Sequence, residues 1–325
     1  MTWLVTGGAG YIGSHVVHAL LDAGLAPVVI DDLSSGVESF VPERVPFVRG
    51  TLLDGDLVEQ TLRDHEVEGV IHLAGFKYAG VSVQRPLHTY EQNITATLTL
   101  LRAMERAGVT RMVFSSSAAT YGTPDVDLVT EDTPTAPESP YGETKLVGEW
   151  LLRDAARVSD LTHTSLRYFN VVGSGSPDLF DTSPHNLFPI VFDMLYRGET
   201  PRINGDDYPT PDGTCVRDYI HVSDLALAHV EAARALADGR SLEPVYNLGS
   251  GEGVSVRQIM DTIREVTAID FVPEVRERRA GDPARIVANG DRAARDLGWE
   301  MRYSLRDMVE SAWQARKAAG DAYPG

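Results

Sequence analysis

The chain has very little cysteine: one residue, Cys215, among 325. A single cysteine forms no intrachain disulfide, and a lone thiol does not make a metal site, so we predict no metal centre. Long apolar runs are missing too. No stretch approaches 18 apolar residues, which argues against a membrane-spanning helix. The chain opens on a strand-like segment, Thr2 to Thr6, without the regions of a secretory signal, and we expect a cytoplasmic protein.

Basic residues are also scarce. Lysine and arginine total 29 against 47 acidic residues, which gives a net charge of −18. The densest basic stretch, Arg276 to Arg279, is interrupted by Glu277, and a chain this acidic repels nucleic acid and anionic membranes. We therefore predict no nucleic-acid partner and no membrane partner. Hydrophobic residues make up 43%, enough for a sizeable core.

The first half alternates short β-branched runs with helical apolar spacing. Strands separated by helices pair in parallel through right-handed crossovers, so this pattern predicts a doubly wound α/β sheet of the Rossmann type. The predicted strands are Trp3–Val5, Pro27–Ile30, Pro46–Val48, Gly69–Leu73, Arg111–Phe114 and Thr164–Phe169, and the predicted helices are Ile12–Leu21, Asn93–Ala107 and Gly142–Arg157.

After Gly173 the composition changes. Gly, Ser, Pro and Asp cluster up to Pro184, which indicates a loop or a domain boundary. Two later stretches, Asp218–Ala233 and Val245–Leu248, again have the pattern of the sheet domain. We therefore expect a discontinuous division. Residues 1–175, with about 218–250, form a Rossmann domain, and residues 176–217 and 251–325 form a smaller C-terminal α/β substrate domain.

A glycine turn joins the first strand to the first helix. Gly7, Gly10 and Gly13 give the G-x-x-G-x-x-G spacing that lets a backbone approach a pyrophosphate at a helix N-terminus. Asp31 ends the next strand, where a carboxylate accepts hydrogen bonds from ribose hydroxyls and repels a 2′-phosphate. The turn therefore predicts a site for a dinucleotide, and Asp31 favours NAD over NADP.

A tyrosine and a lysine stand four residues apart at a predicted helix start. Tyr141 and Lys145 then share one helix face. The pKa of free tyrosine is about 10, so the phenol needs a nearby cation to act as a base at neutral pH. Three serines, Ser115 to Ser117, end a predicted strand, where open α/β sheets bind ligands. Together these residues predict acid/base chemistry beside the cofactor.

Seven segments carry a family resemblance. The whole chain resembles the extended short-chain dehydrogenase/reductase family and, within it, the UDP-glucose 4-epimerases. The segments are Gly7–Ser14, Leu73–Lys77, Ser115–Ser117, Ser139–Lys145, Leu166–Asn170, Gly213–Val222 and Arg278–Asp282. The resemblance implies that UDP-glucose and UDP-galactose interconvert by inversion at C4, through a transient 4-keto sugar and tightly bound NAD. It also implies a homodimer, with the helices near 93–107 and 142–157 between subunits.

The resemblance also implies roles for individual residues. The catalytic residues are Tyr141 as acid/base, Ser117 on the sugar 4-oxygen, and Lys145. The NAD-binding residues are Gly7, Gly10, Tyr11, Ile12, Gly13, Asp31, Asp32, Leu52, Phe76, Lys77, Asn93, Ser115, Tyr141, Lys145 and Tyr168. The residues that bind the UDP-sugar are Ser117, Tyr141, Asn170, Asn186, Leu187, Arg217, Tyr219, Arg279, Asp282 and Ile286.

A few positions depart from the family pattern. Thr51 stands where the family usually has an aspartate, Asn204 replaces an aromatic residue, and Cys215 replaces a glycine. Ile286 takes the place of the residue that gates the sugar pocket, and its intermediate size leaves N-acetylated sugars open as substrates. UDP-glucuronate and UDP-pentoses also stay open.

These residues disfavour two other functions. A 4,6-dehydratase needs an acid and a base beside the catalytic hydroxyl, whereas here Ser117 is followed by Ala118 and Ala119. A protein that only senses a dinucleotide has no use for Tyr141, Lys145 and Ser117 together.

Overall fold

A seven-stranded parallel sheet forms the centre of the computed structural model, which describes residues 1–278 and 283–320. The strand order is β11-β6-β5-β4-β1-β2-β3, and every pair of neighbours is parallel. This confirms the predicted doubly wound fold. The strands are β1 (Thr2–Thr6), β2 (Ala26–Asp31), β3 (Phe47–Arg49), β4 (Gly69–His72), β5 (Arg111–Ser115), β6 (Thr162–Tyr168) and β11 (Val245–Leu248).

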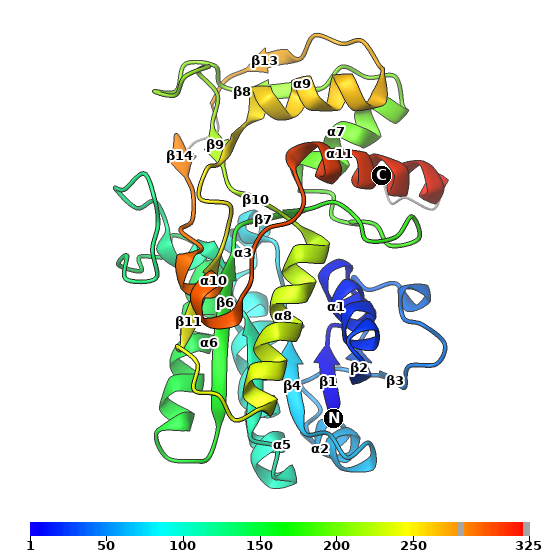
Figure 1. The fold of residues 1–325 in the computed structure, drawn as a ribbon, viewed down its shortest axis with the longest axis vertical. Coiled ribbons are helices and arrows are strands. Elements are labelled where there is room, and N and C mark those ends of the chain that lie inside the picture. Colours follow the sequence, from blue (N-terminus) through cyan, green and yellow to red (C-terminus); the bar gives the residue numbers. More distant parts are fainter. Residues whose placement is uncertain (279–282, 321–325) are drawn as a thin grey trace.

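Helices cover both faces of this sheet because its strands are apolar on both sides. In β1, Trp3 and Val5 pack into one core cluster and Leu4 packs into another, and all three are fully buried. Figure 1 shows α1 and α8 on one side of the strands. The helices of this part are α1 (Tyr11–Asp22), α2 (Gly55–Asp64), α3 (Ala79–Gln84), α4 (Pro86–Tyr90), α5 (Ala96–Ala107), α6 (Pro140–Ala156) and α8 (Val222–Ala237).

The start of α5 differs from the prediction. A helix was expected from Asn93, but Glu91–Thr95 forms a wider π-type turn before the regular helix begins at Ala96. Such turns recur at functional sites because they redirect one side chain. Here the turn carries Asn93, which the sequence predicts as a cofactor residue. The helix α2 was not predicted, although Asp54 caps it by accepting a hydrogen bond from the Leu57 amide.

A smaller part lies beyond the carboxyl ends of the sheet strands, in the upper half of Figure 1. Its core joins three helices, with Phe192, Ile263 and Val309 among the buried residues. No helix within the described ranges is long and apolar enough to cross a bilayer. The helices of this part are α7 (Leu187–Tyr196), α9 (Val256–Thr267) and α11 (Leu305–Ala319), whereas α10 (Asp291–Leu297) packs against α8 and β11 of the larger part. The short strands are β7 (Asn170–Val172), β8 (Arg202–Asn204), β9 (Val216–Arg217), β10 (Tyr219–His221), β12 (Val254–Ser255), β13 (Glu274–Arg276) and β14 (Arg285–Ile286).

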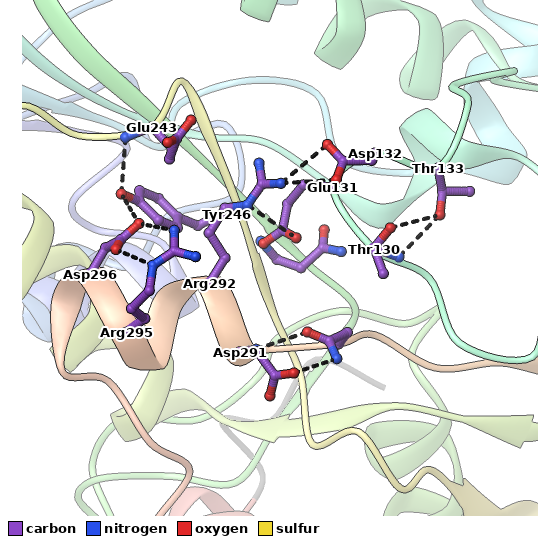
Figure 2. Close-up of polar contacts among 12 residues, drawn as sticks. Thr130, Glu131, Asp132, Thr133, Glu243, Tyr246, Asp291, Arg292, Arg295 and Asp296 are labelled. Atoms are coloured by element: carbon purple, nitrogen blue, oxygen red, sulfur yellow. Dashed lines mark hydrogen bonds and ion pairs between the residues drawn. The ribbon is translucent and has the colours of Figure 1, made fainter.

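Polar contacts fix α10 against the sheet (Figure 2). The Arg292 guanidinium lies 3.6 Å from the buried Glu131 carboxylate and 3.1 Å from that of Asp132. At the other end of the helix, the Tyr246 hydroxyl donates to Asp296 over 3.2 Å. These contacts tie the C-terminal segment, which carries Ile286 five residues before α10, to the edge of the central sheet.

Buried histidines make the fold sensitive to acid. Burial lowers the pKa of His15 and of His229 to about 4, and that of His72 to about 3. Since these values lie below the unfolded value near 6.5, the unfolded chain binds more protons as the pH falls through that window. Each neutral histidine then costs about 2 kcal/mol of stability at pH 5 relative to pH 7. We expect urea unfolding to show a loss of several kcal/mol between pH 7.5 and pH 5.

Buried carboxylates act in the opposite direction. Burial raises the pKa of Asp31 and of Asp218, so their protonation favours the folded chain at the acid end. A free energy of unfolding that stays constant or rises on going from pH 7.5 to pH 5 contradicts the expected balance.

Candidate functional site

A cavity of about 970 Å³ opens at the carboxyl ends of β1 and β4, two paired strands whose following helices α1 and α5 cover opposite faces of the sheet. This is the switch point at which doubly wound sheets bind ligands. Both parts of the chain contribute to its wall. The predicted site residues that line it are Gly7, Gly10, Tyr11, Ile12, Gly13, Asp31, Asp32, Leu52, Phe76, Lys77, Tyr141, Lys145, Tyr168, Asn170, Asn186, Leu187, Arg217 and Tyr219.

The glycine turn leaves room for a phosphate at the start of α1. Gly7 has φ +71°, and a Cβ there meets the Ala74 amide nitrogen at 2.8 Å. A Cβ on Gly13 meets the Gly7 carbonyl oxygen at 2.1 Å, so only glycine permits this close turn. Gly7, Gly10 and Gly13 line the cavity without side chains, and the N-terminus of α1 faces the same space. The residues present therefore fit a dinucleotide pyrophosphate.

Asp31 ends β2 at the edge of the cavity. Its carboxylate accepts hydrogen bonds from the Ala9 amide over 3.0 Å and from the Leu33 amide over 2.8 Å. Burial raises the pKa of Asp31, and these two amides lower it. Each carboxylate oxygen still has a lone pair to accept a ribose hydroxyl. The neighbouring Asp32 accepts from the Ser34 amide, and Leu52 lies buried beside the cavity wall.

Tyr141 and Lys145 meet at the start of α6. The helix begins at Pro140 with Ser139 as its N-cap, so the two side chains lie one turn apart on one face. The Lys145 ammonium lies 5.8 Å from the centre of the Tyr141 ring and donates to the Ser115 carbonyl over 2.8 Å. Burial lowers the pKa of Lys145 to about 8.

Burial disfavours the phenolate form of Tyr141 that a base requires. Burial raises the pKa of Tyr141, and its hydrogen bond with the Ser117 hydroxyl lowers it in part. Ser117 itself is nearly buried and begins a tight turn by accepting from the Ala119 amide. The charge that offsets burial has to come from a cation next to the phenol, either Lys145 or a bound group.

Asn93 joins the cofactor side of the cavity to the catalytic helix. Its side-chain oxygen accepts from the Phe76 amide over 2.7 Å, and its amide donates to the Thr144 hydroxyl over 2.8 Å. Thr144 in turn donates to the Tyr141 carbonyl. Asn93 therefore lies behind the cavity wall, holding the loop that carries Phe76 and Lys77 against the start of α6.

Ser115 and Ile286 also lie behind the wall. The Ser115 hydroxyl is 2.6 Å from the Tyr168 hydroxyl and is buried. Ile286 packs with Tyr121, Val129 and Phe169.

The other end of the cavity brings together residues that are far apart in the chain. Asn170 donates to the Asp218 carbonyl over 2.9 Å, and Arg217 donates to the neighbouring Val216 carbonyl. Tyr219 and Leu187 add apolar surface. Arg279 and Asp282, also predicted for this end, lie outside the described residues.

Some residues of the cavity were not predicted. Tyr78 and His185 line it with their rings at 4.9 Å, and the Asp181 carboxylate accepts from the Asn186 side chain over 2.7 Å. Asp181 belongs to the stretch up to Pro184 that the sequence marked only as a loop or boundary, and His185 follows it directly. The available signal was a carboxylate six residues and an imidazole two residues before the predicted Leu187.

Comparisons with known proteins agree with this geometry. The NAD dependent epimerase/dehydratase family matches residues 3–249. A UDP-glucose 4-epimerase of Azospirillum brasilense is 45% identical over 314 residues, which cover 95% of this chain and 90% of that protein. A crystal structure of a UDP-glucose 4-epimerase has a TM-score of 0.95 at 42% identity and covers 99% of both chains.

A second structure carries ligands. The UDP-glucose-4-epimerase of Stenotrophomonas maltophila, with bound NAD and formylated UDP-arabinopyranose, has a TM-score of 0.94 at 39% identity and covers 99% of both chains. With the family matched over most of the chain and relatives aligned almost end to end, this chain belongs to the NAD dependent epimerase/dehydratase family and, within it, to the UDP-glucose 4-epimerases.

Proposed function

We propose that this chain interconverts UDP-glucose and UDP-galactose by removing and restoring hydrogen at C4 of the sugar. One observation carries the proposal: Tyr141, Lys145 and the glycine turn line the same cavity as Asn186 and Arg217. Tyr141 and Lys145 lie beside the glycine turn that fits a dinucleotide, and Asn186 and Arg217 add polar groups that can hold a nucleotide. This combination suits a nucleotide sugar as the substrate. We assign residues 1–175 and about 218–250 to NAD, and residues 176–217 and 251–325 to the UDP-sugar.

The cofactor is NAD, which takes hydride from C4 and returns it. On the chain side, Gly7, Gly10 and Gly13 present open backbone to the pyrophosphate, and Asp31 accepts ribose hydroxyls. Lys77 is exposed at the cavity and would supply a cation for the phosphates, and Lys145 lines the cavity where it would hold the nicotinamide ribose. Tyr11, Ile12, Asp32, Leu52, Phe76, Asn93, Ser115 and Tyr168 complete this half of the site.

Tyr141 is the acid/base of the proposed reaction. Its phenolate oxygen takes the proton of the 4-hydroxyl while Ser117 donates to the same sugar oxygen. When the 4-keto sugar is reduced on its other face, the phenol returns the proton to that oxygen. The Lys145 ammonium, buried one turn away, stabilises the phenolate and offsets the effect of burial on the pKa of Tyr141.

Inversion requires the sugar to turn while the nucleotide stays fixed. Asn170, Asn186 and Arg217 supply hydrogen bonds at the end of the cavity away from Tyr141, and Tyr219 with Leu187 packs beside them. We assign these residues, with Arg279 and Asp282, to the UDP half. Ile286 packs behind the wall against Tyr121, Val129 and Phe169, and its strand β14 pairs with β9 at Arg217.

The test is a direct assay of the purified protein. UDP-galactose is incubated without added NAD, and UDP-glucose is followed by NMR. We expect interconversion without added cofactor, because NAD stays bound through both transfers. No interconversion, even with NAD supplied, contradicts the proposal. The same assay is run with UDP-N-acetylglucosamine, UDP-glucuronate and UDP-pentoses. It decides which of these UDP-sugars are substrates, since Ile286 is smaller than an aromatic residue at the position that gates the sugar pocket.

We also propose that the protein works as a homodimer in the cytoplasm, where its single buried cysteine stays reduced. Large apolar side chains are exposed on α3, α4 and α6, three helices that pack against one another, with Leu87 at 84%, Val83 at 62% and Trp150 at 45%. Such a patch on adjacent helices suits a second copy. Light scattering at micromolar concentration should give twice the chain mass.

Substitution separates this contact from general surface effects. Leu87→Asp places a charge in the patch and is expected to yield a monomer. Val272→Asp, at an equally exposed position in the smaller part, serves as the control and should stay dimeric. A monomer in the unsubstituted protein contradicts the proposal.

A further inference from the structure

An ion pair without an assigned role lies directly behind the catalytic residues. Glu149 on α6 and Arg167 on β6 are exposed by only 6% and 5%. The Arg167 guanidinium donates two hydrogen bonds to the Glu149 carboxylate, at 2.8 Å from Nε to Oε1 and 2.5 Å from Nη2 to Oε2. A bidentate pair of this kind fixes both side chains in one orientation, which makes it suited to hold other groups in place.

The carboxylate holds the serine segment that contacts Lys145 and Tyr141. The Ser116 hydroxyl, fully buried, donates to Glu149 Oε1 over 2.5 Å. Its two neighbours are the reactive part of the segment: the Ser115 carbonyl accepts from Lys145, and the Ser117 hydroxyl bonds Tyr141. Fixing Ser116 therefore fixes both neighbours relative to α6.

The guanidinium holds the other end of the same turn. Arg167 lies 4.7 Å from the centre of the Tyr121 ring, which closes the tight turn Ala118–Tyr121 that follows Ser117. The Tyr121 hydroxyl donates to Asn247 on β11 over 2.7 Å. The turn is thus held from α6, from β6 and from β11 at once.

Charge is the second consequence. Glu149 lies one helical turn after Lys145, and its carboxylate raises the pKa of Lys145 against the lowering by burial. The other titratable or charged groups around this ammonium are Tyr141 on its own helix, Tyr168 and Arg167 on β6, and His72 on β4. Burial keeps His72 neutral, because its pKa is lowered to about 3.

We propose that Glu149, gripped by Arg167, is a positioning residue of the reaction: through Ser116 it sets Ser115 and Ser117 against Tyr141, and its negative charge holds Lys145 in the ammonium form. Lys145 must stay protonated to stabilise the phenolate, and it must point at Tyr141. One carboxylate meets both needs. The kinetic side of this proposal rests on the proposed function, whereas the state of Lys145 can be measured without turnover.

The chain offers an unusually clean measurement. It contains three lysines, Lys77, Lys145 and Lys317, of which only Lys145 is buried. With isotope-labelled lysine, the side-chain NMR signals titrate separately, and Lys77→Arg and Lys317→Arg assign them. In Glu149→Gln, whose amide oxygen still accepts from Ser116, we expect the pKa of Lys145 to fall by about one unit.

A second variant separates position from charge. Ser116→Ala keeps the ion pair but frees the serine turn, so kcat should fall about tenfold while the pKa of Lys145 and the amount of bound NAD stay unchanged. If Glu149→Gln does not fold because Arg167 is left unpaired, Glu149→Gln/Arg167→Gln takes its place, with a smaller expected fall because the positive charge of Arg167 is removed as well. As a control, Asp193→Asn removes the partner of another buried arginine, Arg316, and should leave Lys145 unchanged.

The outcomes test the charge role and the positioning role of Glu149 separately. A Lys145 pKa equal to that of the unsubstituted protein in a folded Glu149 variant overturns the charge role. Unchanged kcat in Ser116→Ala overturns the positioning role. Absence of any epimerisation by the unsubstituted protein refutes the proposed function, and the NMR titration still reports on Glu149.

Discussion

Replacing Tyr141 with phenylalanine is expected to lower kcat by about three orders of magnitude or more, because general acid/base catalysis is worth roughly 10²–10⁴ and both proton transfers use this one oxygen. The ring, the start of α6 and the cavity wall stay as they are. Bound NAD, measured after denaturation, should remain near the amount held by the unsubstituted protein. The unfolding temperature should shift little, since the hydroxyl bonds the Ser117 side chain and the cap of α6 is formed by Ser139 instead.

The control for this substitution is Tyr196→Phe. Tyr196 ends α7 with its ring 49% exposed, and Arg316 stacks on the ring that phenylalanine keeps. It should retain full activity. If Tyr141→Phe turns over within tenfold of the unsubstituted protein, Tyr141 is not the proton carrier and another group has to be found.

Sequence patterns predicted the parts of the site that are local in the chain. The glycine turn depends on neighbours within seven residues, and the facing of Tyr141 and Lys145 depends only on helix periodicity. The parallel pairing follows from the alternation of strands and helices, because strands joined through right-handed helical crossovers pair in parallel. These rules require no knowledge of distant contacts.

Contacts between distant segments could not be predicted in this way. Ile286 packs against Tyr121 and Val129, more than 150 residues earlier, and nothing in the local pattern names these neighbours. Arg167 belongs to the segment Leu166–Asn170 of the family resemblance, which names no partner for it. Its partner Glu149 stands four residues after Lys145. The helix periodicity places Glu149 on the face of Lys145, but the buried partner becomes visible only when β6 lies beside α6.

The π-type turn at Glu91–Thr95 has a similar explanation. Its residues have ordinary helix propensity, so the sequence predicts a regular helix from Asn93. The extra residue in the turn lets Asn93 bond both the Phe76 backbone and the Thr144 hydroxyl. Tertiary hydrogen bonds, which propensity does not include, decide the local geometry there.

The second large effect is expected at the glycine turn. Gly13→Ala should reduce bound NAD to below about a tenth of the protein, because an overpacked turn has to open rather than compress. A Cβ on residue 13 meets the Gly7 carbonyl oxygen at 2.1 Å and the Gly8 Cα at 2.9 Å, and both are backbone atoms. That carbonyl also accepts from the Gly10 amide over 3.1 Å, so moving it disturbs the whole turn. Activity should be lost with the cofactor.

A substitution at the opposite end of the same helix distinguishes loss of the cradle from loss of α1. Gly24 follows α1 with φ +74°, and a Cβ there meets nothing within 4 Å. Asparagine tolerates this left-handed conformation, so Gly24→Asn should keep its NAD and most of its activity. Gly13 lies in the first turn of α1 and Gly24 follows its last turn, so NAD lost only from Gly13→Ala reports on the glycine turn rather than on the stability of α1. Full NAD content in Gly13→Ala contradicts the assignment of this turn to the cofactor.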